Sequence, residues 1–253
     1  MKVHIISFLF FALVFMEGTA KAETLVMGVD NAYRPHYWTE HGQIVGPALD
    51  VCKAVLRDMG YEIRVKITPW ARVLHELENG GSDFICLLVH KKEREAYSYF
   101  AQEVMSENHY QLIANVESNF EWAGDYETLI DRSVSSVRAW AYPLFYDDRF
   151  KRIDFDDERL VVRHVALNKD AIGVGLYYGL RNAAEKLGVK SEIRFLKPPL
   201  PVHALYAGFS KKKGHEELAQ EYSKRLRGFK KTAAYQKIYR RYNMTAPVWN
   251  LEN

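Results

Sequence analysis

The stretch that most constrains the fold is the run DFICLLV at residues 83–89. Every residue after Asp83 in this run is apolar. A strand with one face in water alternates apolar and polar residues, whereas a short continuous apolar run is typical of a strand that is covered on both faces. Strands of that kind belong to parallel sheets that carry helices on both sides. The run therefore predicts an α/β protein.

The residues on either side of this run indicate a binding site. Trp70 and Arg72 stand at the front of the helix predicted at 71–78, and Arg94 comes shortly after the strand. In α/β proteins, ligands bind where strand ends face a cleft. A guanidinium group pairs with a carboxylate through two parallel hydrogen bonds. We therefore expect a pocket for a small anionic or zwitterionic molecule.

The rest of the chain continues the α/β pattern in two series. Apolar spacing and turn residues predict helices at 47–59, 71–78, 141–150, 178–187, 216–229 and 232–242, and strands at 24–29, 61–67, 83–89, 110–114, 134–137, 161–165, 170–176, 192–196 and 203–209. Two such series joined by two short crossings predict a two-lobed clamshell, in which each lobe is a mixed, mostly parallel sheet flanked by helices.

The first 22 residues have the features of a signal peptide. Lys2 supplies the positive charge, residues 5–16 form the apolar run, and the segment Thr19 to Ala22 offers small residues for cleavage. The apolar run is too short to span a bilayer comfortably. We expect cleavage after Ala22 and a soluble, exported protein located in the periplasm.

Charge and cysteine content argue against several classes of function. The 35 basic and 32 acidic residues nearly cancel, which does not suit a nucleic-acid binder that must neutralise many phosphates. The two cysteines, Cys52 and Cys86, have no third sulfur or histidine pair nearby, so we predict no metal and no cofactor. Because the sequence does not bring their Cα atoms within about 7 Å, two buried free thiols are favoured over a disulfide.

Seven motifs then follow one another in a recognisable order. They are LVMGVDNAYRPHYW, GQIVGPALDVCKAVLRDMGYEIRV, TPWARVLHELENGGSDFI, KKERE, NKDAIGV, YAGFSKK and AYQKIYRRY. With these motifs, the chain after residue 22 resembles the family 3 periplasmic solute-binding proteins, the polar amino-acid type of ABC-importer receptors.

The resemblance implies a type II periplasmic-binding-protein clamshell with two short hinge crossings. Lobe 1 would comprise residues 23–113 and 204–253, and lobe 2 residues 114–203, with the signal peptide at 1–22. The cleft would close on a small-molecule ligand by hinge motion. The expected partners are this ligand and an ABC-transporter membrane component or a sensor, and the expected state is a monomer.

The resemblance also assigns roles to particular residues. Arg94 matches the arginine that clamps the ligand carboxylate, and Tyr33 matches the aromatic residue that covers the ligand. Trp70 and Arg72 match the tryptophan-x-arginine entrance of a helix. Other interpretations are a surface arginine for Arg94, and ordinary packing roles for Tyr33 and Trp70.

The departures from the family pattern concern the rest of the pocket. Gly175 stands where the family has the aspartate that holds the ligand amino group. Apolar Leu87 to Val89 replace small polar residues, and Arg138-Ala139-Trp140 replaces the usual Arg-Gly-Thr turn. A buried ammonium without a partner would cost several kcal/mol. We therefore include Arg138 and Trp140 in the site and expect an apolar or aromatic carboxylate rather than an ordinary α-amino acid.

Two other functions stay open. One is a periplasmic enzyme on the same scaffold, because some relatives look like cyclohexadienyl dehydratases. The nearby Glu93 and His90 are more typical of a surface loop than of a general acid, and no Ser-His-Asp order, HExxH, P-loop or GxGxxG motif occurs. The other is a sensor or cell-wall module. We predict a binding protein with no catalytic residues.

Overall fold

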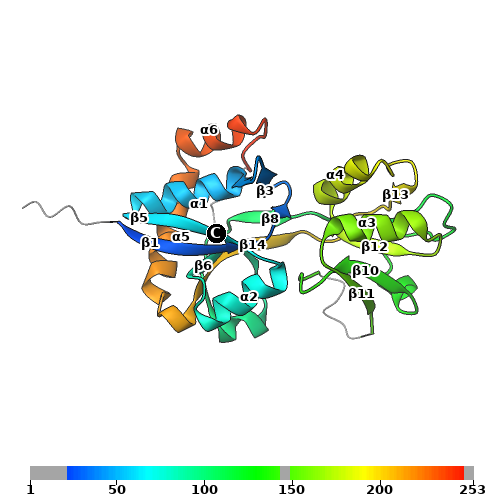
Figure 1. Ribbon diagram of the computed structural model, residues 1–253, viewed down its shortest axis with the longest axis horizontal. Helices are drawn as coiled ribbons and strands as arrows, with labels where there is room; N and C mark the ends of the chain where they lie inside the picture. The colour runs from blue at the N-terminus through cyan, green and yellow to red at the C-terminus, as the bar shows by residue number, and fades with distance from the viewer. Residues whose placement is uncertain (1–21, 143–148, 248–253) are drawn as a thin grey trace, which may run out of the picture.

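The computed structural model describes residues 22–142 and 149–247, and it divides into two lobes that each have a sheet of their own (Figure 1). The predicted two-lobed α/β clamshell is confirmed. Residues 1–21, which include most of the predicted signal peptide, lie outside the described residues. In the described part of the chain, none of the helices combines the length and the apolar character needed to cross a membrane.

The first lobe is built on a sheet in the order β5-β1-β6-β14-β7, with β8 also paired to β14. β1 is parallel to β5 and β6, whereas β14 is antiparallel to β6, β7 and β8. All residues of β6 are buried, as the apolar run predicted. The strands are β1 (Glu23–Val29), β5 (Tyr61–Ile67), β6 (Phe84–Val89), β7 (Ser98–Phe100), β8 (Ser106–Asn108) and β14 (His203–Ser210).

Helices cover both faces of this sheet, which explains why β6 is apolar throughout. Figure 1 shows α1 and α2 on opposite sides of the strands. α2 contributes Val73 and Leu77 to a cluster with Ile85 and Leu88 of β6. The helices are α1 (Pro47–Asp58), α2 (Trp70–Asn79), α5 (Glu216–Lys230) and α6 (Ala233–Arg241), and a small sheet is formed by β2 (Ala32–Tyr33), β3 (Tyr37–Glu40) and β4 (Gln43–Val45).

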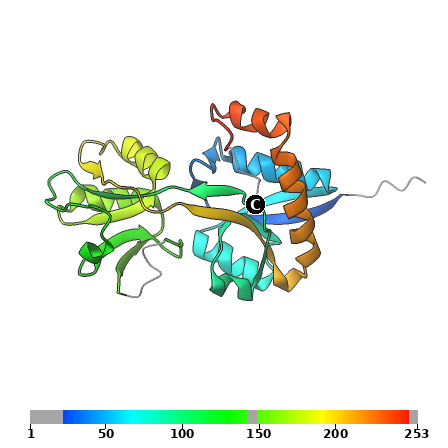
Figure 2. The ribbon, with the colours of Figure 1, turned by 180° about the vertical axis from the view of Figure 1, so that it is seen from behind.

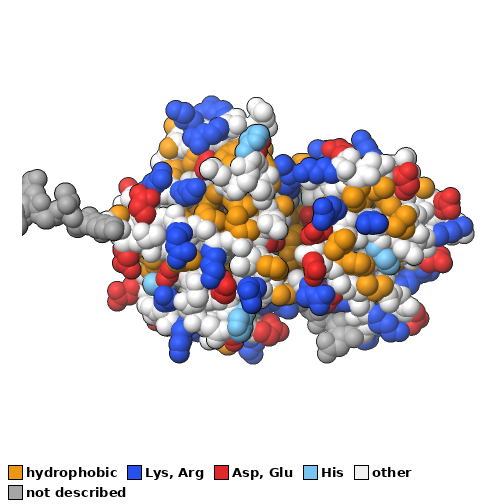
Figure 3. Space-filling model, viewed as in Figure 1, with side chains coloured by type: hydrophobic (Ala, Val, Ile, Leu, Met, Phe, Trp, Pro, Cys, Tyr) orange, Lys and Arg blue, Asp and Glu red, His pale blue; other side chains and the backbone are white. Residues whose placement is uncertain are grey.

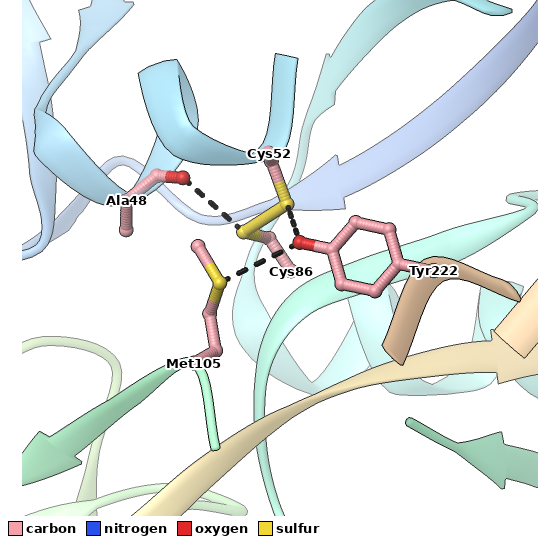
Figure 4. Close-up of a disulfide and its surroundings, with 5 residues drawn as sticks. All are labelled: Ala48, Cys52, Cys86, Met105 and Tyr222. Atoms are coloured by element: carbon pink, nitrogen blue, oxygen red, sulfur yellow. Dashed lines mark hydrogen bonds between the residues drawn. A yellow bond between two sulfur atoms is a disulfide. The ribbon is translucent and has the colours of Figure 1, made fainter. Parts of the chain in front are cut away.

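On the side of α1, the two cysteines form a disulfide (Figure 4). The Cα atoms of Cys52 on α1 and Cys86 on β6 are 6.6 Å apart. The Tyr222 hydroxyl of α5 lies 3.1 Å from Cys52 Sγ. The expectation of two free thiols is therefore wrong. The reason is that α1 packs across β6, a contact between segments 34 residues apart that the local sequence pattern does not reveal.

The second lobe has a sheet in the order β11-β10-β12-β9-β13. β10 is parallel to β11 and β12, and β9 is antiparallel to β12 and β13. The elements are β9 (Tyr110–Asn115), β10 (Ser133–Val137), β11 (Lys151–Phe155), α3 (Glu158–Leu167), β12 (Ile172–Leu176), α4 (Tyr177–Leu187) and β13 (Ile193–Phe195).

Two secondary-structure predictions in this lobe differ from the structure. The strand expected at 161–165 is part of α3, in which Val161, Val162 and Val165 are buried at helical spacing and Asp157 caps the N-terminus through Leu160 N. β-Branched valines favour strands locally, but packing against the sheet decides here. The expectation missed β11, and most of the helix predicted at 141–150 lies outside the described residues.

Two chain crossings connect the lobes, and Figure 2 shows them running side by side. In the first crossing, β8 ends at Asn108 in one sheet and β9 begins at Tyr110 in the other. In the second crossing, the chain leaves β13 and enters β14, and Leu200 N donates to Tyr110 O at 3.1 Å. The residue boundaries of the lobes, expected at 113/114 and 203/204, stay a prediction.

Candidate functional site

A small cavity lies where the two lobes meet. Figure 3 shows the groove between the lobes, with acidic and basic side chains along it. The cavity has a volume of about 10 Å³, roughly the space that one water molecule needs. It brings together four of the six residues expected to bind ligand. Its lining residues are Tyr33, Trp70, Leu87, Val89, Arg94, Tyr110, Trp140 and Ala141.

Arg94 lines this cavity. It belongs to the short 3-10 helix η1 (Lys92–Ala96), which directly follows the central strand β6. The residue is only 6% exposed. Its Nη1 donates to Val89 O at 2.9 Å and its Nη2 donates to Ala139 O of the other lobe at 3.3 Å. Arg94 is therefore not a surface residue.

Two donors of the first lobe converge on one oxygen of the second. Trp70 Nε1 donates to Ala139 O at 3.2 Å, beside the bond from Arg94 Nη2. Ala139 has a φ of 60°, the left-handed region in which a residue with a Cβ is strained. This is the position at which the family pattern has glycine. The Ala139 carbonyl thus accepts two hydrogen bonds from the facing lobe.

Aromatic rings from both lobes close the cavity. The rings of Tyr33 and Trp140 meet edge to face, with centroids 5.0 Å apart. Such contacts stabilise beyond the area that they bury. Because Tyr33 is in lobe 1 and Trp140 in lobe 2, the contact exists only while the lobes are together.

A buried polar network lies behind these rings. Asn108 Nδ2 donates to the hydroxyls of Tyr33 and Tyr110, both at 2.6 Å, and the Tyr110 hydroxyl donates to Ala141 O at 3.0 Å. Asn108 Oδ1 faces His36 Nε2 at 3.3 Å, and Ser106 Oγ lies 3.0 Å from His36 Nδ1. Since Asn108 Oδ1 can only accept, His36 is protonated on Nε2 and accepts from Ser106.

Burial keeps the imidazole of this network neutral. Desolvation lowers the pKa of His36 to about 4, and the hydrogen bond to Asn108 opposes that shift only in part. Periodicity did not identify His36, Asn108 or Tyr110, because all three look like ordinary core or loop positions. The aromatic segment around Pro35 was the only sequence feature that pointed to this part of the site.

Two carboxyl groups with raised pKa values, outside the lining of the cavity, also escaped prediction. Burial raises the pKa of Asp30 to about 7, opposed by a hydrogen bond from the Tyr37 hydroxyl at 2.7 Å. Burial raises the pKa of Glu158 to about 8, opposed by a hydrogen bond from Leu176 N at 2.6 Å. The charge of Asp30 raises the pKa of Glu158 further. Asp30 could have been found as the residue that follows β1, but Glu158 could not, because α3 was expected to be a strand.

The other predicted residues lie away from the cavity. Arg72 is exposed on α2, and Arg138 is exposed with Nε 3.6 Å from Asp156 Oδ1. Their contact with a ligand stays a prediction. His90 is exposed and pairs with Glu95, at 2.7 Å. Within residues 22–142 and 149–247, no group of three or more histidine, cysteine or acidic side chains could hold a metal ion.

Comparison with known proteins identifies the fold and the family. A search of curated proteins found no match. A mutant of ArgBP from T. maritima has a TM-score of 0.72 and 17% identity, covering 87% of this chain and 95% of that chain. A histidine kinase sensor domain with similarity to periplasmic binding proteins has a TM-score of 0.77 and 16% identity, covering 90% and 99%.

An ancestral amino acid-binding protein, a precursor of cyclohexadienyl dehydratase, has a TM-score of 0.68 and 18% identity, covering 87% of this chain and 95% of that chain. At such identities these similarities show the fold alone. The family model of bacterial extracellular solute-binding proteins, family 3, matches residues 25–245, in agreement with the motifs and with the two-lobed fold. The chain belongs to the bacterial extracellular solute-binding proteins of family 3.

Proposed function

We propose that this protein is a periplasmic receptor that captures a small carboxylate-bearing solute between its lobes, for ABC-type import or for sensing. The observation that carries the proposal is the environment of Arg94. Its guanidinium is buried, and in the described part of the chain no acidic side chain lies within 4.0 Å of it. A buried charge without a counter-charge is costly. A ligand carboxylate would supply the missing anion.

The contacts of Arg94 also indicate how the carboxylate is held. Arg94 Nη2 and Trp70 Nε1 both point at Ala139 O, which is a neutral acceptor from the facing lobe. When the lobes separate, these two donors lose their acceptor together. A carboxylate fits the vacated position better than a carbonyl does, because it carries a full negative charge and two oxygens.

The remainder of the cavity supports an apolar or aromatic body for the ligand. Tyr33, Trp70, Tyr110 and Trp140 surround Arg94 together with Leu87 and Val89. The present volume of about 10 Å³ holds no solute of this kind. Binding therefore requires the Trp140 segment to move away from Arg94, by the hinge motion expected of a clamshell.

Membership of the family supports the proposed location and partners. The signal peptide expected at 1–22 would place the protein in the periplasm. Similar folds include arginine-binding proteins and a histidine kinase sensor domain, which supports both delivery to a transporter and sensing. The proposal also includes a monomeric state and lobe boundaries at 113/114 and 203/204.

Proton transfer is a second candidate function, favoured by one observation. Burial raises the pKa of Glu158 to about 8, so at neutral pH this carboxyl could donate a proton to a leaving group. One similar fold belongs to a precursor of cyclohexadienyl dehydratase. Incubation with prephenate or arogenate, followed by detection of the aromatic product, tests this activity. Binding remains the proposed function because Arg94 needs an anion whether or not a reaction follows.

A thermal-shift screen of carboxylates tests the binding function. A ligand that binds only the native state raises the midpoint by mass action. We expect the shift to disappear in Arg94→Ala and to persist in Arg64→Ala, which removes an exposed arginine of the same lobe. Each shift is measured from the ligand-free midpoint of the same variant, so that a change in stability is not mistaken for a change in binding. Equal shifts in wild type and Arg94→Ala would exclude the clamp.

A further inference from the structure

One turn of the second lobe lies at the proposed binding site. This turn, at residues 138–140, follows β10. Its Ala139 carbonyl accepts hydrogen bonds from Arg94 Nη2 and Trp70 Nε1 of the first lobe, at 3.3 and 3.2 Å. Its Trp140 side chain lines the same cavity, and the residue is only 6% exposed. The turn therefore takes up hydrogen-bond donors of the site and part of its space.

A bound carboxylate and the Ala139 carbonyl need the same two donors. The proposed function places a carboxylate oxygen at Arg94 and Trp70, where the Ala139 oxygen lies. The cavity beside them has a volume of about 10 Å³, roughly the space that one water molecule needs. A solute with a carboxylate and an apolar body does not fit there. The ligand and the turn therefore exclude each other.

The backbone of Ala139 is strained in this position. Its φ is 60°, in the left-handed region that is unfavourable for a residue with a Cβ. Strained residues persist where the surrounding structure holds them, and they are common at ligand clamps and switch regions. Two hydrogen bonds from the first lobe hold the Ala139 carbonyl here. When the lobes separate, both bonds are lost and the turn is free to relax.

Ending β10 is the simpler role of this turn. Trp140 N donates to Val137 O at 3.2 Å, and a positive φ is common in tight turns. This role explains the path of the chain. It does not explain why two donors of the first lobe converge on one carbonyl of the second. Nor does it explain why the Trp140 ring meets Tyr33 edge to face, with the ring centroids 5.0 Å apart. Those contacts join the lobes, which a turn that only ends a strand does not require.

We propose that the turn at residues 138–140 is an internal competitor of the ligand. In the ligand-free protein the Ala139 carbonyl occupies the position of a ligand carboxylate oxygen, and the Trp140 ring occupies the space of the apolar body. The ligand displaces the turn, and the lobes then close on the ligand instead. Its apparent affinity is therefore lowered by the fraction of molecules in which the turn is in place. This inference rests on the proposed function, because it takes Arg94 as the carboxylate clamp.

Hydrogen exchange of the Trp70 indole N–H, measured by NMR at pH 7 without a ligand, tests the contact. The signal is assigned as the one that Trp70→Phe lacks. In wild type, the bond to Ala139 O should slow the exchange of this hydrogen with solvent. Trp140→Ala removes the contact with Tyr33 and should speed the exchange about two- to tenfold, the range for aromatic pairs. Trp140→Leu serves the same purpose if the alanine variant does not fold.

Trp122→Ala is the matched control for the exchange measurement. Trp122 belongs to the second lobe and has the same exposure as Trp140, 6%, but its ring packs on Tyr126 of its own lobe. The control should leave the exchange of the Trp70 indole unchanged. The inference is overturned if this N–H exchanges in ligand-free wild type as fast as a solvent-exposed indole, or if Trp140→Ala speeds its exchange no more than Trp122→Ala does.

Isothermal titration calorimetry with 3-phenylpropanoate at pH 7 tests the competition. Trp140→Ala should bind this aromatic carboxylate about two- to tenfold more tightly than wild type, because fewer molecules hold the turn in the site. A Trp140 that only contacts the ligand predicts the opposite, and equal or weaker binding by Trp140→Ala overturns the inference. If the probe binds neither protein, the exchange measurement decides alone. Failure of the proposed function shows separately, as probe binding that Arg94→Ala leaves unchanged.

Discussion

Acidification should destabilise this protein through one buried imidazole, that of His36. The ring lies between Asn108 and Ser106 in the network that joins Tyr33 of β2 to Tyr110 of β9. Its neutral form uses both nitrogens, Nε2 as a donor and Nδ1 as an acceptor. Protonation would place a second donor opposite Ser106 and a charge in a desolvated position beside His109, whose charge also disfavours it.

The magnitude follows from the shift in the pKa of His36. The native pKa is about 4, against 6.5 for the unfolded chain. Between these two values the unfolded state binds more protons, so stability rises with pH and is lost as pH falls. At about 1.4 kcal/mol per pKa unit, the full loss is about 3 kcal/mol. About 2 kcal/mol of this is already lost between pH 7 and pH 5.

Urea denaturation at pH 7 and pH 5 measures this loss. Other groups titrate in the same range, so the quantity of interest is the difference between wild type and His36→Gln, which has no imidazole to protonate. We expect the pH dependence of the free energy of unfolding to be smaller in His36→Gln by about 2 kcal/mol. His75→Gln, at an exposed histidine of α2, should behave as wild type. If His36→Gln retains the wild-type pH dependence, the buried network does not hold a neutral imidazole.

Three further predictions concern the cysteines and two strained positions. Reducing the Cys52–Cys86 bond should lower the free energy of unfolding by about 4 kcal/mol, because the cross-link closes a loop of 34 residues. A denaturant titration with and without reductant measures this change. Two titratable thiols in the unreduced protein would show that the disulfide is absent. Ala139→Gly should raise the thermal midpoint, because glycine adopts a φ of 60° without the strain that a Cβ causes. The expected gain in the free energy of unfolding is up to about 1 kcal/mol. A lowered midpoint would show that the strain is absent. Gly46→Ala should lower the free energy of unfolding by more than about 1 kcal/mol. The reason is that the alanine Cβ would lie 2.4 Å from His36 O, at a residue whose φ is 146°. An unchanged thermal midpoint in calorimetry would refute this prediction.

The sequence predicted the parts of this molecule that depend on local periodicity. The all-apolar run of β6 correctly indicated a strand between two layers of helices, and the spacing of α1, α2, α5 and α6 matched the structure closely. The valines of α3 were misread because their β-branched side chains favour strands, while burial at positions i, i+1 and i+4 requires a helix. The disulfide was missed for a different reason, since it depends on how α1 packs across β6.

In the site, too, the residues that belong to a local sequence pattern were predicted and the others were not. Arg94, Tyr33 and Trp70 were found because each stands in a motif, and Trp140 was found because its turn departs from the family pattern. The structure brings all four to one cavity. Arg72 stands in the motif of Trp70 and Arg138 in the turn of Trp140, but both arginines are exposed. Glu158 belongs to no motif, and only the structure shows that its carboxylate lies beside Gly175 and accepts from Leu176 N.

The buried guanidinium of Arg94 suggests why closure should depend on the ligand. Among the residues that the structure describes, no acidic side chain lies within 4.0 Å of it. In the ligand-free protein, closing the lobes desolvates this charge, and the neutral Ala139 carbonyl compensates for it only in part. A ligand carboxylate would supply the missing negative charge. Such a ligand would bind the closed state better than the open state, and that difference in affinity would shift the population toward closure.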